Sequence, residues 1–166
     1  MKKTKKLVFA ALLAALVCVS TLIITVTLPG GGYFNLGDCF VITSGVVLGP
    51  LFGFLAAAIG SGLADIISGY ALYAPATFII KGLMALVVGF ICLKNNKMLK
   101  VFFSGVVAEI IMIAGYFLYE LMLNGFSLAI LGVAGNALQG VVGVITSFVL
   151  VLLLTKNKAI NKFISQ

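Results

Sequence analysis

Two carboxylates and a phenol lie along the apolar stretch Ala108–Glu120, AEIIMIAGYFLYE. At about 100° per residue, Glu109, Tyr116 and Glu120 fall within a narrow arc of a helix, so this helix has one polar face. An acidic side chain at the centre of a bilayer-spanning helix costs roughly 2.5 to 3.5 kcal/mol, and such residues normally face a protein interior or a water-filled cavity. The polar face is therefore a candidate ligand-binding surface.

The chain around this face has the composition of a membrane protein. Of its 166 residues, 63% are hydrophobic and 9% are charged, and the mean hydropathy is +1.28. Apolar runs of about 20 residues alternate with short polar breaks, which predicts membrane-spanning helices rather than the strands of a membrane barrel. We expect an all-α integral membrane protein that forms a single transmembrane domain over residues 1–166.

The net charge of +7 is concentrated in three clusters of lysines. They lie at the start of the chain, in one loop and at the end, each beside an apolar run: Lys2, Lys3, Lys5 and Lys6; Lys94, Lys97 and Lys100; Lys156, Lys158 and Lys162. The positive-inside rule places both termini and that loop in the cytoplasm, with anionic lipid as a secondary partner. The charge thus indicates topology, and we expect no nucleic-acid partner.

Six spans agree with this topology. If Gly37–Gly49 and Leu51–Ser68 formed one span, the Lys94 loop would fall on the opposite side from the N-terminus, against its charge. The first apolar run could be a secretory signal, but it is long enough to span and is interpreted as a retained helix. The expected helices are residues 7–28, 37–49, 51–68, 76–93, 101–123 and 128–154.

Polar side chains on two other expected helices lie at a similar depth to the glutamate face. Lys81 stands apart from the lysine clusters, as a counter-ion for a carboxylate or an anionic ligand group, or as a lysine that snorkels to the interface. Asn136 and Gln139 share a helix face among glycines, where they could line a cavity or join helices by hydrogen bonds. We interpret them as parts of a common cavity.

The first outer loop, PGGGYFNL, adds two aromatic rings and an amide. It could be a mobile flap over a ligand, or a turn whose aromatic rings anchor at the lipid interface. Aromatic faces, paired amides and both signs of charge suit a small, polar, ring-containing ligand. The predicted substrate-binding residues are Tyr33, Asn35, Lys81, Glu109, Tyr116, Glu120, Asn136 and Gln139.

The sequence lacks the motifs of common catalytic and metal sites. It has no histidine, no GxxxxGK[ST] phosphate loop, no GxSxG elbow and no HExxH helix. Cys18, Cys39 and Cys92 have no paired spacing, so neither a disulfide framework nor a zinc site is indicated. We expect no enzyme activity, no catalytic residues, no metal and no cofactor.

Small residues recur along the first expected helix. Ala10, Ala11, Ala14 and Ala15 form two overlapping small-xxx-small patterns, which let another helix backbone approach closely. Packing within the chain or simple helix propensity is the alternative interpretation.

Over nearly its whole length, the chain resembles the substrate-binding S components of energy-coupling factor (ECF) vitamin transporters. The resemblance rests on GYFNLGDCFVITSGVVLGPLFGFLAAAIGSGLADIISGYALYAPATFIIKGLMALVVGF, followed by AEIIMIAGYFLYE and NALQG. It is nearest to the branch associated with pyridoxine-type or hydroxymethylpyrimidine ligands, rather than to the riboflavin or biotin branches.

This resemblance implies a high-affinity subunit in the bacterial cell membrane that captures a small water-soluble vitamin. It implies that the alanine pattern contacts a membrane-embedded coupling subunit, that two cytoplasmic ATPase subunits hydrolyse ATP, and that Gly30–Leu36 is a lid. It also implies that the whole S component topples in the membrane to carry its pocket inward. The competing hypothesis is a stand-alone, proton-coupled secondary transporter with Glu109 as its proton site.

Overall fold

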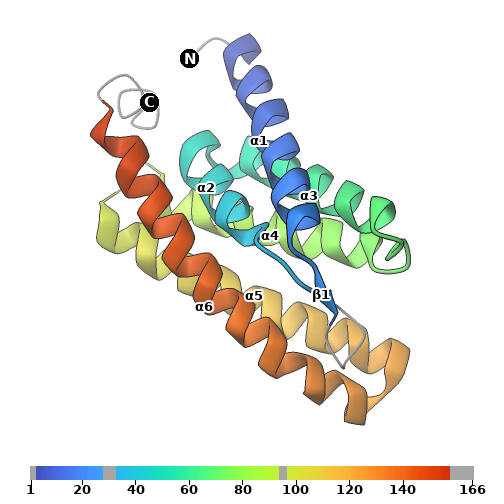
Figure 1. Cartoon of the computed structure of the whole chain (residues 1–166). Coiled ribbons are helices and arrows are strands. Elements are labelled where there is room, and N and C mark those ends of the chain that lie inside the picture. Colours follow the sequence, from blue (N-terminus) through green and yellow to red (C-terminus); the bar gives the residue numbers. More distant parts are fainter. Residues whose placement is uncertain (1–2, 28–32, 94–96, 158–166) are drawn as a thin grey trace.

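The computed structural model describes residues 3–27, 33–93 and 97–157. This part of the chain forms six α-helices and one short hairpin (Figure 1). The elements are α1 (Lys3–Ile23), β1 (Val26–Thr27), β2 (Tyr33–Phe34), α2 (Asp38–Leu48), α3 (Pro50–Ile67), α4 (Ala74–Cys92), α5 (Met98–Asn124) and α6 (Phe126–Lys156). All the helices except α2 are long and apolar enough to cross a membrane.

The short helix α2 is the centre of the bundle. It packs against α1, α3, α4 and α6, and its 11 residues extend about 16 Å, roughly half of a 30 Å hydrocarbon core. Most of its side chains are buried, as expected for a helix that is apolar on all sides. It ends at Gly49, whose φ of 78° favours glycine, and Pro50 begins α3. The expected span 37–49 is therefore a short central helix.

Helix α1 ends earlier than the expected residue 28. After Ile23 the chain becomes extended, and Val26–Thr27 pairs antiparallel with Tyr33–Phe34. The residues Ile24, Thr25 and Val26 are all β-branched, and such side chains favour extended backbone over helix. The consequence is a hairpin that connects α1 to α2 along the side of the bundle (Figure 1).

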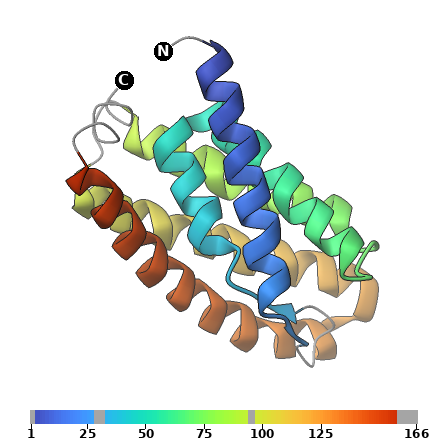
Figure 2. The ribbon, with the colours of Figure 1, turned by 45° about the horizontal axis from the view of Figure 1, so that its top comes forward.

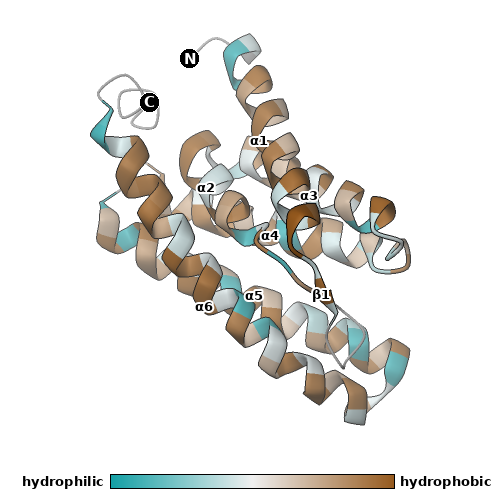
Figure 3. Cartoon of the chain, viewed as in Figure 1, coloured by the Kyte–Doolittle hydropathy of each residue, from teal (hydrophilic) through white to brown (hydrophobic). Residues whose placement is uncertain are grey.

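The outer surface of the bundle is apolar. Large hydrophobic side chains are exposed on successive helices, among them Leu12, Ile66, Ile110 and Leu153 (Figure 3). The interior, in contrast, holds charged and amide side chains at exposed fractions below a tenth. This distribution suits a protein surrounded by lipid, because lipid contacts the apolar surface and the polar groups find partners inside.

The lysine-bearing ends of the helices lie toward the same side. The start of α1, the end of α4, the start of α5 and the end of α6 lie at one end of the molecule, away from the hairpin (Figure 2). Of the three lysine clusters, Lys2, Lys94, Lys158 and Lys162 lie outside the described residues.

Candidate functional site

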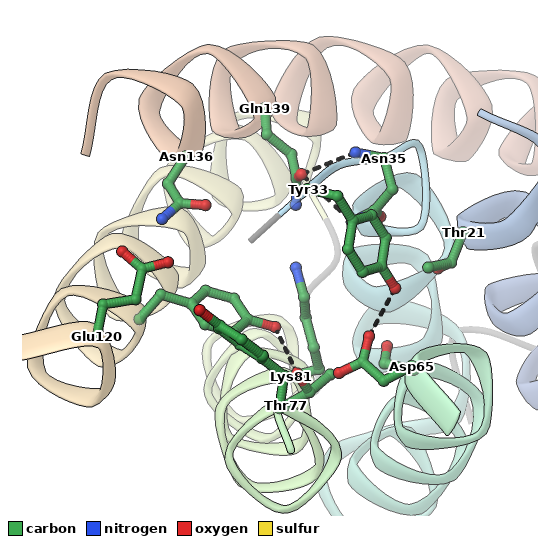
Figure 4. Close-up of a pocket in the computed structure, with 12 residues that line it drawn as sticks. Thr21, Tyr33, Asn35, Asp65, Thr77, Lys81, Glu120, Asn136 and Gln139 are labelled. Atoms are coloured by element: carbon green, nitrogen blue, oxygen red, sulfur yellow. Dashed lines mark hydrogen bonds between the residues drawn. The ribbon is translucent and has the colours of Figure 1, made fainter. Parts of the chain in front are cut away.

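A polar pocket lies inside the bundle, between the hairpin and helices α3 to α6 (Figure 4). The space between its side chains is about 430 Å³ with the solvent at its mouth included, but only about 30 Å³ is open to the centres of water-sized molecules. Its lining side chains must therefore move apart to admit a ring compound. They are Thr21, Tyr33, Asn35, Ser61, Asp65, Tyr73, Thr77, Lys81, Tyr116, Glu120, Asn136 and Gln139.

The pocket brings together the predicted substrate-binding residues with one exception. Tyr33, Asn35, Lys81, Tyr116, Glu120, Asn136 and Gln139 all line it. Sequence reasoning did not assign Thr21, Ser61, Asp65, Tyr73 or Thr77 to the site. Of these, Asp65 carried a usable signal, because an ionisable residue within an apolar helix usually faces a functional interior.

Glu109 is the exception, and its role in substrate binding stays a prediction. It does not line the pocket but is buried where α5 meets α2 and α6, next to Gly140, Gly143 and Asp38. Neither of its carboxyl oxygens has a hydrogen-bond partner. Glu109 and Glu120 lie on the same face of α5, but Glu109 is about three helical turns from Glu120 along the helix axis.

Lys81 is the counter-ion of Asp38, at the start of α2. Its ammonium donates to Asp38 Oδ1 and to Met112 Sδ, and the side chains of the ion pair are 4% and 1% exposed. The sequence left open which carboxylate Lys81 would reach; the structure buries Asp38 and pairs it with Lys81. Because removal of one partner leaves a buried charge unpaired, this pair constrains α2 against α4.

A second set of hydrogen bonds connects the same carboxylate to the loop before α2. Gln139 Nε2 donates to Asp38 Oδ2 at 2.6 Å, and the backbone N–H of Asn35 donates to Gln139 Oε1 at 2.9 Å. Asn35 Oδ1 then accepts from the backbone N–H of Gly37 at 2.9 Å. The amides thus join the loop, α6 and α2, which is the helix-joining role that we had held as the alternative for Gln139.

The hairpin covers the pocket through Tyr33. Its hydroxyl donates to Asp65 Oδ1 at 2.6 Å, and its ring centre lies 4.7 Å from that of Tyr70. Burial, and then the hydrogen bond to Asp65, raise the pKa of Tyr33, so the hydroxyl keeps its proton and remains a donor. Of the predicted lid Gly30–Leu36, residues 30–32 lie outside the described part of the chain.

Glu120 and Asn136 form the opposite end of the pocket (Figure 4). Glu120 is 1% exposed and packs against Gly132, one helical turn before Asn136 on α6. Between this end and Lys81, the hydroxyls of Tyr116 and Thr77 share a hydrogen bond of 3.0 Å. One carboxyl oxygen of Asp65 thus accepts from a tyrosine, whereas Asp65 Oδ2 and Glu120 Oε2 have no hydrogen-bond partner.

The alanine pattern lies outside the pocket, on an apolar groove between α1 and α3. Ala10, Ala11, Ala14 and Ala15 line this groove, which has a volume of about 550 Å³. The backbone of α1 approaches α3 closely, because a Cβ at Gly60 would meet the carbonyl oxygen of Ala14. Part of the pattern thus serves packing within the chain.

Within residues 3–27, 33–93 and 97–157, no group of three or more His, Cys, Asp or Glu side chains could hold a metal ion. The cysteines Cys18, Cys39 and Cys92 are free.

The family described as "ECF-type riboflavin transporter, S component" matches residues 1–156. The chain belongs to this family. A relative from Pyrococcus woesei, described as "Uncharacterized protein in gap 3'region", is 32% identical over 130 residues, which cover 78% of this chain and 87% of the relative. The predicted resemblance to ECF S components is confirmed, whereas the pyridoxine or hydroxymethylpyrimidine branch stays a prediction.

Membership assigns a class of activity. The S component is a multi-pass membrane protein and the substrate-capture subunit of an ECF transporter. ECF S components bind a small-molecule substrate and work with a membrane-embedded coupling subunit and ATPases, and the family is a transporter family, not an enzyme class.

Proposed function

We propose that this S component captures, at high affinity, a small water-soluble vitamin or vitamin precursor with a single nitrogen-containing ring, of the pyridoxine or hydroxymethylpyrimidine kind. The observation that carries the proposal is the polar pocket, which has tyrosine rings, amides and carboxylates inside an apolar bundle. Tyr33 and Tyr116 offer faces to a ring, and Asn136 offers a donor and an acceptor to its substituents.

The size of the pocket favours one ring over three. Its total space is about 430 Å³ with the mouth included, and little of it is open while Tyr33 bonds to Asp65. Riboflavin is the second candidate, because the family description names it. Its three fused rings and sugar-alcohol chain require a larger opening of the hairpin than a single ring does.

The first test is to identify the small molecule that copurifies with the protein. We would grow the expressing cells in rich medium, purify the protein in detergent and identify bound compounds by mass spectrometry. Calorimetry with pyridoxine, 4-amino-5-hydroxymethyl-2-methylpyrimidine and riboflavin would follow. We expect a stoichiometric single-ring compound and a sub-micromolar Kd for one of the two single-ring members of the set; tight binding of riboflavin alone, or a blank preparation that binds none of the three, would contradict the proposal.

A binding variant with a matched control locates the site. Asn136→Ala removes an amide from the pocket and should weaken the best ligand at least tenfold. Thr155→Ala removes a hydroxyl whose hydrogen bond to Leu152 O is exposed, near the end of the same helix and outside the pocket lining, and should leave the affinity unchanged. Equal affinity of both variants would place the site elsewhere.

We propose that the groove of Ala11 and Ala15 receives the coupling subunit. Both alanines are exposed in the groove, where a larger side chain would block close approach. In cells with the full transporter, Ala11→Leu/Ala15→Leu should impair uptake and leave the Kd of the isolated protein intact. Ala134→Leu, at an exposed alanine of α6, is the control, and equal loss of uptake and affinity would contradict the assignment.

We also propose that the lysine-bearing end faces the cytoplasm of a bacterial cell membrane and that α2 counts as a sixth, short span. Fusion of a topology reporter to either terminus should report the cytoplasm. Reconstitution in liposomes without partner subunits tests the alternative function: a proton gradient should drive no accumulation, whereas proton-driven uptake would favour a stand-alone transporter with Glu109 as its proton site.

A further inference from the structure

We propose that the substrate carries a cationic or N–H donor group and that Glu120, with Asn136 beside it, is the subsite for this group. The inference rests on the proposed function, since it concerns the ligand of the same pocket. It adds a chemical requirement that excludes part of the vitamin class, namely anionic compounds and compounds without a nitrogen donor at this end.

The first observation is that Glu120 is buried and that one of its carboxyl oxygens has no hydrogen-bond partner. Its side chain lines the pocket and is 1% exposed, and its Oε2 atom accepts no hydrogen bond. The carboxyl group fits against α6 because residue 132 is glycine, and any Cβ there would meet Glu120 Oε2. A buried carboxyl oxygen without a donor is costly in the empty protein, so its site is built for a group that arrives from outside the chain.

The second observation is the balance of charge around the pocket. Lys81 is the cation of the lining, but its ammonium already donates to Asp38 and to Met112. Asp65 and Glu120 are the lining carboxylates, and no lysine of the described residues forms an ion pair with either. The lining therefore presents more carboxyl groups than free cations, which favours a positively charged or donor-rich ligand over an anion.

The third observation is that acceptors without partners lie at both ends. Opposite Glu120, Asp65 Oδ2 and Ser61 Oγ are buried and without hydrogen-bond partners, while Asp65 Oδ1 is occupied by Tyr33. Figure 4 shows Glu120 and Asp65 on opposite sides of the pocket, with Lys81 between them. A ligand that satisfies both ends carries donors on opposite sides of its ring, and the stronger contact is the charge-assisted one at Glu120.

The test uses two pairs of compounds that differ in one group. Pyridoxamine and pyridoxine exchange an aminomethyl for a hydroxymethyl group, and 4-amino-5-hydroxymethyl-2-methylpyrimidine is compared with its 4-hydroxy analogue. Each is titrated into the purified parent protein and into Glu120→Gln. In at least one pair we expect the amine to bind about 10- to 100-fold more tightly than its oxygen counterpart, a ratio that should fall close to one in Glu120→Gln.

The ratio of the two Kd values within a pair distinguishes a loss of recognition from a loss of folding, because a poorly folded variant binds both compounds of the pair less tightly by the same factor. A second readout is the unfolding temperature without ligand. Glu120→Gln removes a buried charge that has no partner, so the empty variant should unfold at the same temperature as the parent or higher.

Two results would overturn the inference in different ways. If a single-ring compound binds tightly and Glu120→Gln leaves both its affinity and the ratio unchanged, the cationic subsite is wrong and the proposed function stands. If neither pair nor riboflavin binds, and no compound copurifies, the proposed function fails and the inference with it.

Discussion

Helix α5 carries two buried glutamates on one face, and the structure places them in different surroundings. Glu120 packs against Gly132 of α6, whereas Glu109 packs against Gly140 and Gly143 of the same helix. Both are nearly inaccessible, at 1% and 4%, and both have a carboxyl oxygen without a hydrogen-bond partner. Yet Glu120 lines the pocket and Glu109 does not.

The difference comes from what faces each glutamate across the bundle. Opposite Glu109 lies α2, whose Asp38 already holds Lys81 and Gln139. The short helix α2 makes its principal contacts with α1, α3, α4 and α6, whereas the side chain of Glu120 lines the pocket. The length of α2 thus divides the polar face of α5 into a packed part and an open part.

The largest effect is expected at the packed part. Lys81→Met should leave the buried charge of Asp38 without its cation and destabilise the protein by about 3–5 kcal/mol. Thermal unfolding in detergent, followed by size-exclusion chromatography, measures this. The double variant Asp38→Asn/Lys81→Met should recover most of the loss, since it removes both charges. An unchanged unfolding temperature in Lys81→Met would show that the pair does not hold α2 in place.

Alanine substitutions at two glycines of α6 should change the free energy of unfolding by different amounts at the packed part and at the open part. At Gly143 an added Cβ would lie 2.9 Å from Asp38 Cβ, close to the backbone and unable to move far. Gly143→Ala should therefore destabilise by about 1–2 kcal/mol, even after the gain in helix propensity. At Gly132 the three atoms nearest to the added Cβ all belong to the Glu120 carboxyl group, which can turn into the pocket.

Gly132→Ala should accordingly keep the unfolding temperature and weaken the ligand. Thermal unfolding and calorimetry of both alanine variants provide the comparison. Matching losses of stability in the two variants would mean that the Glu120 end is as tightly packed as the Glu109 end.

Replacing each glutamate by glutamine tests, through the affinity for the ligand, whether Glu120 belongs to the binding site and Glu109 does not. Glu109→Gln should change the Kd of the best ligand by less than about threefold, because Glu109 does not line the pocket. Glu120→Gln should raise it about tenfold, or about 1.4 kcal/mol. Calorimetry with the same ligand measures both. A loss of tenfold or more in Glu109→Gln would restore it to the binding site that the sequence suggested.

The sequence predicted one side of this arrangement well. Helical periodicity is a local property, so Glu109, Tyr116 and Glu120 could be assigned to one face of α5 without any knowledge of other helices. The amides of α6 and the tyrosine of the outer loop were found in the same way, by polar type within apolar surroundings.

The partners of these residues could not be predicted, because they come from distant parts of the chain. Asp38 pairs with Lys81 across 43 positions, and Gln139 accepts from Asn35 across 104. Which carboxylate Lys81 reaches depends on where α2 ends and how it packs. The expected span 37–49 already ended beside the observed end of α2 at Leu48, because Gly49 and Pro50 interrupt the apolar run, but the helices that pack around α2 could not be predicted in this way.

The smallest effect is expected at Tyr116, which lies between the two glutamates on α5. Its hydroxyl shares a hydrogen bond with Thr77, and its ring centre lies 5.6 Å from the Lys81 ammonium. Tyr116→Phe removes the hydrogen bond and keeps the ring, so it should cost about 0.5–1.5 kcal/mol of stability. If the ring face is what contacts a ligand, the affinity should change by less than about threefold, measured by calorimetry. A tenfold loss would show that the hydroxyl belongs to the open part of the face together with Glu120, and that the packed part ends before Tyr116.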